Sequence, residues 1–313
     1  MKRRTLIGLL GCAASLVFVR RAQAAPPETI ADGTLIGRGK LLVVHENTAG
    51  RIVALDSSSY IPTNPTGPGD VVVVGSYCGT RVLAPIFSRG VKAVIATDAG
   101  IGKDEAGISG LKYGESIGVP VAAIVTMSAE TSNGRSTLLG AISRANAQAR
   151  ALGVAPGMAA YEAAALLAKA PPGKPSPTSH GAEETPVVVE ATPHGRIWTA
   201  GGTTAFHDKI PNDVFCSGSN ASRVFSDGTL RIAAKGAIAN DAGIAKNNSA
   251  VEGVLLLGER GVPAASVATL SARLGEGSST WNDGVISVVN PPAAARGVKI
   301  GMTAKEAARL MLL

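Results

Sequence analysis

Two aspartates, each followed by the same turn and a lysine, are the side chains best suited to chemistry in this sequence. Asp98-Ala99-Gly100-Ile101 precedes Lys103, and the pattern recurs as Asp241-Ala242-Gly243-Ile244 before Lys246. Each follows a short apolar run that predicts a strand, and α/β sheets usually bind ligands at the carboxyl ends of strands. The aspartates could act as acid, base or divalent-metal ligand, and the lysines could bind an anion. The same residues also commonly cap turns, so both interpretations stay open.

A second repeated feature is a glycine-containing loop rich in hydroxyl groups, between a predicted strand and a helix. Its residues are Ser128, Ser136 and Thr137 in the first copy and Ser271, Ser279 and Thr280 in the second. Such loops can hold a phosphate or carboxylate, so we expect these residues to bind substrate. Arg135 occurs only in the first loop and Arg273 only in the second, so one of two related sites could specialise. Helix caps use the same hydroxyl residues, and the P-loop ending Gly-Lys-Ser/Thr is absent.

The remaining reactive side chains form no recognisable motif. The four histidines (His45, His180, His194 and His207) lack metal-ligand spacing and do not recur between the copies. A conventional zinc site is therefore not expected, although a divalent metal at the aspartates stays open. Cys78 follows a predicted strand, as some nucleophiles do, but no base recurs with it. Cys78 and Cys216 could pair in an oxidising compartment or be two small buried side chains.

The repeated residues belong to a tandem duplication. The segments 98–137 and 241–280 are identical at sixteen positions without a gap, and fainter matches extend on both sides with a period of 143 to 145 residues. Residues 171–186 are rich in Pro and polar residues, which predicts an exposed linker. The chain therefore divides into a first copy at 40–170, this linker and a second copy at 187–313. We expect the site to lie where the copies meet.

Each copy alternates short apolar runs with helical stretches. In the first copy we expect strands at 71–74, 94–97 and 121–125 and helices at 80–89 and 106–117. This order predicts an α/β fold with a mainly parallel sheet.

A final helix follows a Gly-Met pair in each copy, and Thr303 and Glu306 have the spacing of a capping box. Pro291-Pro292 fall where the first copy has a helix-like stretch, 143–152. They predict a shorter or broken helix in the second copy, because proline disrupts a helix interior.

The strand–helix order that opens with Pro68-Gly69-Asp70-Val71 resembles the swivelling α/β domains. These occur in phosphohistidine domains, in the aconitase-type swivel and in relatives of hydroxymethyl-oxoglutarate aldolase. The resemblance covers residues 68 to about 125 and their counterparts, and it implies this fold for each copy. In the aldolase relatives an Arg-Asp pair helps to hold a divalent metal. This chain has Lys103-Asp104 and Lys246-Asn247 nearby, so the arginine is absent from both copies and the acid from one.

The first 24 residues have the pattern of an export signal. A basic head is followed by an uncharged apolar stretch, residues 5–19, and by the small-x-small cleavage pattern Ala22-Gln23-Ala24. The stretch is short for a membrane-spanning helix, so we expect no transmembrane span in the mature chain. Arg3-Arg4 resembles a twin-arginine signal, with general secretion as the other route. The segment before Cys12 resembles a lipobox but is short for one. We expect an exported, periplasmic protein.

Composition limits the class of partner. Hydrophobic residues make up 45% of the 313 residues and charged residues 17%, which is typical of a globular protein. Five of the 30 basic residues and none of the 23 acidic residues lie in the export signal, so the mature chain carries +2 rather than +7. A nucleic-acid-binding surface is therefore not expected.

These observations predict an exported enzyme, a hydrolase or lyase, that acts on a small polar or anionic molecule between the copies. Asp98 and Asp241 would do acid–base or metal chemistry, and Lys103 and Lys246 would bind the anion. The alternative is a non-catalytic exported protein that binds a solute or acts as a scaffold. The sequence does not determine the substrate or the oligomeric state.

Overall fold

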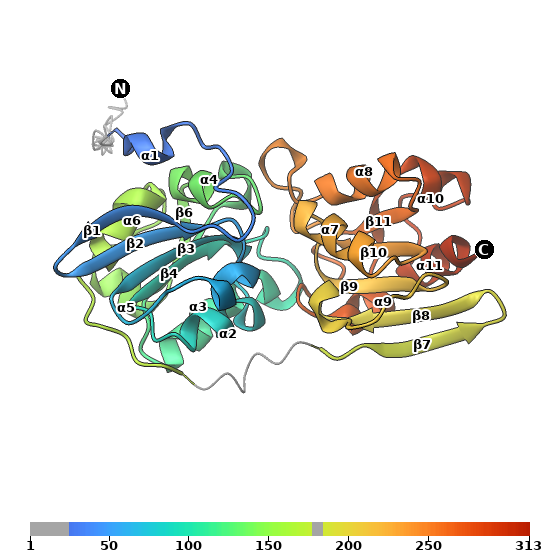
Figure 1. Cartoon of the computed structure of the whole chain (residues 1–313), viewed down its shortest axis with the longest axis horizontal. Helices are drawn as coiled ribbons and strands as arrows, with labels where there is room; N and C mark the ends of the chain where they lie inside the picture. The colour runs from blue at the N-terminus through green and yellow to red at the C-terminus, as the bar shows by residue number, and fades with distance from the viewer. Residues whose placement is uncertain (1–24, 177–183) are drawn as a thin grey trace, which may run out of the picture.

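The computed structural model describes residues 25–176 and 184–313, so the predicted export signal lies outside the described residues. Each copy forms its own six-stranded sheet, and the two sheets lie side by side (Figure 1). The first sheet contains β1 (Leu42–Asn47), β2 (Gly50–Leu55), β3 (Asp70–Tyr77), β4 (Ala93–Thr97), β5 (Val121–Ile124) and β6 (Ile142–Ala145). The second contains β7 (Val187–Thr192), β8 (Gly195–Ala200), β9 (Val214–Asn220), β10 (Gly236–Asn240), β11 (Ala264–Val267) and β12 (Ile286–Val289).

In both sheets, neighbouring strands are also consecutive in the sequence. The central strands β2–β5 and β8–β11 are parallel, whereas β1, β6, β7 and β12 pair antiparallel at the edges. The predicted α/β fold, a tandem duplication of one unit with a mainly parallel sheet, is therefore confirmed.

Helices cover both faces of each sheet. In the first copy they are α2 (Thr80–Phe87), α3 (Ser109–Ser116), α4 (Gly134–Leu139), α5 (Ala147–Ala151) and α6 (Ala160–Leu167), preceded by α1 (Glu28–Ala31). In the second they are α7 (Arg223–Arg231), α8 (Glu252–Glu259), α9 (Gly277–Asp283), α10 (Pro291–Ala295) and α11 (Ala304–Leu312). Short 3-10 turns are η1 (Ser58–Thr63), η2 (Lys103–Ile108), η3 (Thr126–Ser128), η5 (Thr203–Ala205) and η6 (Lys246–Asn248).

The apolar run Val71–Val74 in β3 is explained by burial on both faces of the sheet. Successive side chains of a strand point to opposite faces of the sheet. Val71 and Val73 pack in a core that includes residues of α4 and α6, and Val72 and Val74 pack in a core that includes residues of α2. A strand buried on both faces favours apolar residues at successive positions, and the polar residues of β3, Asp70 and Ser76, flank this run and are hydrogen-bonded. The second copy repeats this arrangement with α9 and α11 on one face and α7 and α8 on the other.

Two expectations about local structure are wrong. The stretch 143–152 is not one helix, because β6 occupies its start and α5 begins only at Ala147. The second copy does not have a shorter helix, since α10 and α5 each contain five residues. Pro291 starts α10, where the first amide needs no partner. Asn146 and Asn290 cap these two helices in the same way. The capping box at Thr303 and Glu306 is confirmed.

The copies face each other through loops that follow the carboxyl ends of the parallel strands. The loop after β4 contacts the loop after β11, because the Lys103 amide donates to the Thr269 carbonyl at 2.9 Å. The loop after β10 reaches the segment after β5, where the Lys246 amide donates to the Ala129 carbonyl at 3.3 Å. Figure 1 shows these loops between the two sheets. The edges at which α/β sheets usually bind ligands therefore meet each other.

Candidate functional site

Two loops, residues 98–102 and 241–245, form the centre of this contact, and we call them the interface loops. A β-carbon added to Gly100 would lie 3.2 Å from the Gly243 Cα, and one added to Gly243 would lie 3.1 Å from the Gly100 Cα. Only glycines allow this approach. Because equivalent residues meet each other, a pseudo-twofold axis passes between them.

Hydrogen bonds repeat this symmetry on both sides of the axis. Thr126 Oγ1 donates to the Ala242 carbonyl, and its counterpart Thr269 Oγ1 donates to the Ala99 carbonyl, both at 3.4 Å. A small apolar cluster that draws Ala99, Ala242 and Leu274 from both copies packs beside these bonds. The interface is thus built twice from the same structural parts.

The interface loops have an unusual backbone. In each loop four successive residues, 99–102 and 242–245, have positive φ angles, although Ile101, Ile244 and Ala245 are not glycines. A left-handed conformation costs an ordinary residue about 1–2 kcal/mol. Hydrogen bonds within each copy, such as those from the Gly100 and Gly243 amides to Asp98 and Asp241, and the contacts between the copies together offset this strain.

Asp98 and Asp241 lie within these loops as hydrogen-bond acceptors. Each is 5% exposed. Asp98 Oδ1 accepts from the amides of Gly100 at 3.0 Å and Thr126 at 2.9 Å, and Asp241 makes the two equivalent bonds at the same distances. Each carboxylate ties its own interface loop to the loop after the next strand. This geometry supports the turn-capping interpretation.

The predicted anion-binding lysines differ from each other in the structure. Lys103 Nζ pairs with Asp283 of the other copy at 2.9 Å, whereas Lys246 is exposed and forms no ion pair with any described residue. Arg273 also crosses the interface, where its guanidinium lies 2.9 Å from Asp104. Hydrogen bonds to Asp104 and Glu276 raise the pKa of Arg273 above its ordinary value. Lys103 and Arg273 thus pair with acids of the opposite copy, whereas the side chain of Lys246 makes no such contact.

The hydroxyl residues predicted to bind substrate form hydrogen bonds within their own copy. Ser136 Oγ accepts from the Glu130 amide at 2.9 Å, and Ser279 Oγ accepts from the Arg273 amide at 3.0 Å. The other four hydroxyls, those of Ser128, Thr137, Ser271 and Thr280, donate to nearby carbonyls. Arg135 binds the segment before β1, with its guanidinium donating to the Thr29 carbonyl at 2.9 Å. None of these residues lines the pocket between the copies.

Metal and thiol chemistry gain no support from the geometry. Within residues 25–176 and 184–313, no three His, Cys, Asp or Glu side chains are grouped to hold a metal. His180 lies outside the described residues. Cys78 and Cys216 are buried and free. Burial raises the pKa of Cys216 to about 12, and burial together with nearby Asp98 raises that of Cys78 further. Neither thiol ionises near neutral pH, so neither is an activated nucleophile.

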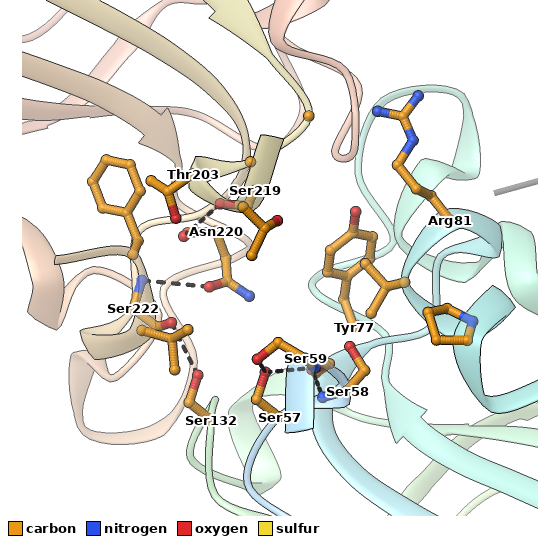
Figure 2. A pocket seen from close by; sticks show the side chains of 18 of the residues that line it. Ser57, Ser58, Ser59, Tyr77, Arg81, Ser132, Thr203, Ser219, Asn220 and Ser222 are labelled. Carbon is orange, nitrogen blue, oxygen red and sulfur yellow. Dashed lines mark hydrogen bonds between the residues drawn. The ribbon is translucent and has the colours of Figure 1, made fainter. Parts of the chain in front are cut away.

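A pocket of about 380 Å³ lies between the two copies. Figure 2 shows polar side chains of both copies around it. The first copy contributes Ser57, Ser58, Ser59, Tyr77, Arg81 and Ser132, and the second contributes Thr203, Ser219, Asn220 and Ser222. Part of the wall is apolar and includes Val82, Pro85, Val224 and Phe225.

The same structural positions of the two copies form this pocket. Residues 57–59 follow β2, and residues 201–204 follow the equivalent strand β8. Tyr77 ends β3, and Asn220 ends β9. The pocket therefore lies at the carboxyl ends of both sheets, but its two halves carry different side chains. A symmetric scaffold thus presents an asymmetric surface to a ligand.

Some polar groups of the pocket are already paired and others are free. Ser132 Oγ donates to Ser222 Oγ at 2.9 Å across the copies, and Ser57 Oγ lies 2.8 Å from Ser59 Oγ. Ser58 is 8% exposed, and its hydroxyl bonds to no described residue. The hydroxyl is therefore available to a ligand.

Arg81 is the one charged residue among those that line the pocket. Arg81 donates from Nη1 to the Gly275 carbonyl at 2.6 Å and forms no ion pair with a described carboxylate. Residues of the first turns of α2 and α7 line the pocket; the Thr80 amide at the start of α2 donates to Ser109 Oγ at 3.0 Å, whereas the N-cap Ser222 of α7 makes no side-chain cap bond. Helix N-termini carry partial positive charge. No Asp or Glu is among the lining residues.

Sequence analysis missed these residues because they differ between the copies. Asp56-Ser57-Ser58-Ser59 corresponds to Gly201-Gly202-Thr203-Thr204, and Tyr77 corresponds to Asn220. A search for repeated identities passes over such positions. The one local signal is the run of three serines directly after a strand.

No protein family matches the chain, and no similar protein was found among the curated proteins or the solved structures. Among the described residues, no helix is both long and apolar enough to cross a membrane.

Proposed function

We propose that the protein binds a small, hydroxylated organic anion in the pocket between its two copies. The observation that carries this proposal is the pocket's composition: hydroxyl groups from both copies, one arginine without an acidic partner, and no lining carboxylate. A sugar acid with a single carboxylate has the matching chemistry.

Size and wall chemistry support a ligand of this class. Pockets of about 300–1,000 Å³ are typical of small-molecule sites, and this one measures about 380 Å³. The hydroxyl of Ser58 and the amide of Asn220 can bind ligand hydroxyls, since neither Ser58 Oγ nor Asn220 Nδ2 has a described partner. The apolar wall at Val82 and Phe225 suits the carbon skeleton of such a ligand.

Arg81 accounts for the negative charge of the proposed ligand. Its guanidinium has five N–H donors in a planar fork, and the bond to the Gly275 carbonyl uses Nη1. The remaining donors suit a carboxylate, which arginine binds in bidentate geometry. The N-termini of α2 and α7 add favourable potential for an anion.

Binding without chemistry is the role that this lining favours. It contains no carboxylate, imidazole or thiol that could act as a general base or nucleophile. The predicted hydrolase or lyase activity needs Asp98 and Asp241, which are 5% exposed and bonded to backbone amides. That activity stays a prediction. The predicted export signal supports a periplasmic location for this binding.

A thermal-shift screen of the signal-free protein tests the proposal. The probes are sodium salts of small hydroxy acids, including gluconate and glycerate, each compared with its neutral alcohol. A bound ligand raises the melting temperature by mass action. We expect a hydroxy acid to raise it, and Arg81→Met and Ser58→Ala to reduce the shift. The exposed Arg260, away from the pocket, provides the matched control Arg260→Met.

Arg81 also bonds to the second copy, so the melting temperature of each variant without ligand must be measured too. A ligand shift that survives both pocket substitutions would overturn the proposal. So would a screen in which no acid stabilises the protein more than its neutral alcohol.

A further inference from the structure

Two polar contacts cross the copy–copy interface at equivalent positions. Asp104 of the first copy pairs with Arg273 of the second, at 2.9 Å. On the other side of the axis, Asn247 of the second copy donates to Glu130 of the first, at 2.7 Å. In the duplication, position 104 corresponds to 247 and position 130 to 273. The same contact is therefore made twice with different residues.

The distribution of charge over these positions is uneven. The first copy carries the two acids, Asp104 and Glu130, whereas the second carries the amide Asn247 and the base Arg273. If two first copies met through this surface, Asp104 would face Glu130 twice. Two like-charged pairs would then replace one ion pair and one hydrogen bond, and like-charge contacts suppress wrong partners.

Two second copies would meet without such repulsion. Asn247 would face Arg273 twice, and Lys246 would occupy the place of Lys103 opposite Asp283. Asp104 and Glu130 are thus the residues that disfavour a pair of first copies.

We propose that these four positions make the interface selective, so that the first copy accepts a second copy as its partner and rejects another first copy. The partner surface can belong to the same chain or to another molecule of this protein. Arg273 and Asp104 are 40% and 59% exposed, and exposed ion pairs add little net stability. The selectivity therefore comes mainly from the two repulsive contacts that a pair of first copies would make, and less from the attraction in the native pair.

The test uses the folded full chain with a protease site inserted in the linker at 177–183 and cut after folding. Isotope-labelled and unlabelled samples are mixed and warmed until mixed-label complexes appear, and native mass spectrometry then counts each pairing. We expect pairs of first copies to be about tenfold rarer than first–second pairs. Equal frequencies would overturn the proposal.

A gain-of-pairing variant sharpens the test. Glu130→Arg would place an arginine opposite Asp104 in a pair of first copies, so such pairs should become detectable. Glu105→Arg is the matched control, because Glu105 lies in the same copy and is exposed, and it should not create them. If both variants behave alike, charge pairing at these positions is not the cause.

The uncut chain provides a second measurement. Asp104→Arg should lower the melting temperature by about 2–4 °C, since it faces Arg273 with a like charge. Arg273→Gln should then cost less in the Asp104→Arg background than in the parent protein, because it removes the like charge across the interface; the contact of Arg273 with Glu276 is lost in both backgrounds and cancels. Equal costs in the two backgrounds would show that the two residues do not act as a pair, which also contradicts the proposal.

Discussion

Removing the Asp98 carboxylate should destabilise the whole interface. In Asp98→Ala the amides of Gly100 and Thr126 lose their acceptor. A buried amide without a partner costs about 1–3 kcal/mol, so the two together cost about 2–6 kcal/mol. In a protein of this size 1 kcal/mol corresponds to about 2–4 °C. The melting temperature of Asp98→Ala should therefore fall by at least about 4 °C in scanning calorimetry.

Three companion variants make this result decisive. Asp241→Ala should cause a similar loss, because it breaks the equivalent bonds. Asp98→Asn retains one oxygen acceptor and should lose less than Asp98→Ala. The exposed Asp208 supplies the control Asp208→Ala, which should change little. If Asp98→Ala melts within about 1 °C of the parent protein, the capping role is refuted and a catalytic role for the carboxylate regains ground.

Two further predictions concern protonation. Cys78 and Cys216 should react with a thiol reagent at pH 8 only after unfolding, since both are buried and the pKa of Cys216 is raised to about 12; rapid labelling of the native protein would contradict this. Burial opposes ionisation of Asp213, but hydrogen bonds from Trp198 and Arg196 outweigh it and lower the pKa of this carboxyl. Its contribution to stability is therefore complete above the ordinary Asp pKa of about 4 and is lost as the pH falls through the lower folded value. Asp213→Asn should flatten the acid side of the stability curve measured by denaturant unfolding, and an unchanged acid limb would show that Asp213 does not contribute to it.

The fold was predictable because short apolar runs and helical stretches can be recognised locally in the sequence, and because the duplication repeats them. The β-branched run Val71–Val74 is typical of a strand buried on both faces, and the alternation of such runs with helical stretches indicates a mainly parallel sheet. The interpretation failed at 143–152 because β6 is an antiparallel edge strand only four residues long. So short a strand has no distinctive period and resembles the start of the helix that follows.

The candidate site was less predictable, because residues that are identical in the two copies are those with the same structural role in both. Asp98 and Asp241 recur because each copy must form the same strained loop against its partner. The proposed ligand need not be symmetric, so the equivalent positions Tyr77 and Asn220 need not carry the same residue. We expected a site between the copies, and a pocket lies there. Asp98 and Asp241 lie in the interface loops and do not line this pocket, and their role as site residues stays a prediction. The residues that line the pocket come from separate segments of both copies, so they lie together only in the folded protein.

Titration calorimetry tests the central claim, anion binding between the copies, most directly. Gluconate and its neutral alcohol sorbitol would be titrated into the parent protein and into Arg81→Met. A charged hydrogen bond contributes about 1.5–3 kcal/mol, which corresponds to roughly a 10- to 100-fold change in affinity. We predict that the parent protein binds gluconate more tightly than sorbitol by this factor, and that Arg81→Met removes the difference. Equal binding of the two compounds by the parent protein, or binding of neither, would contradict the account.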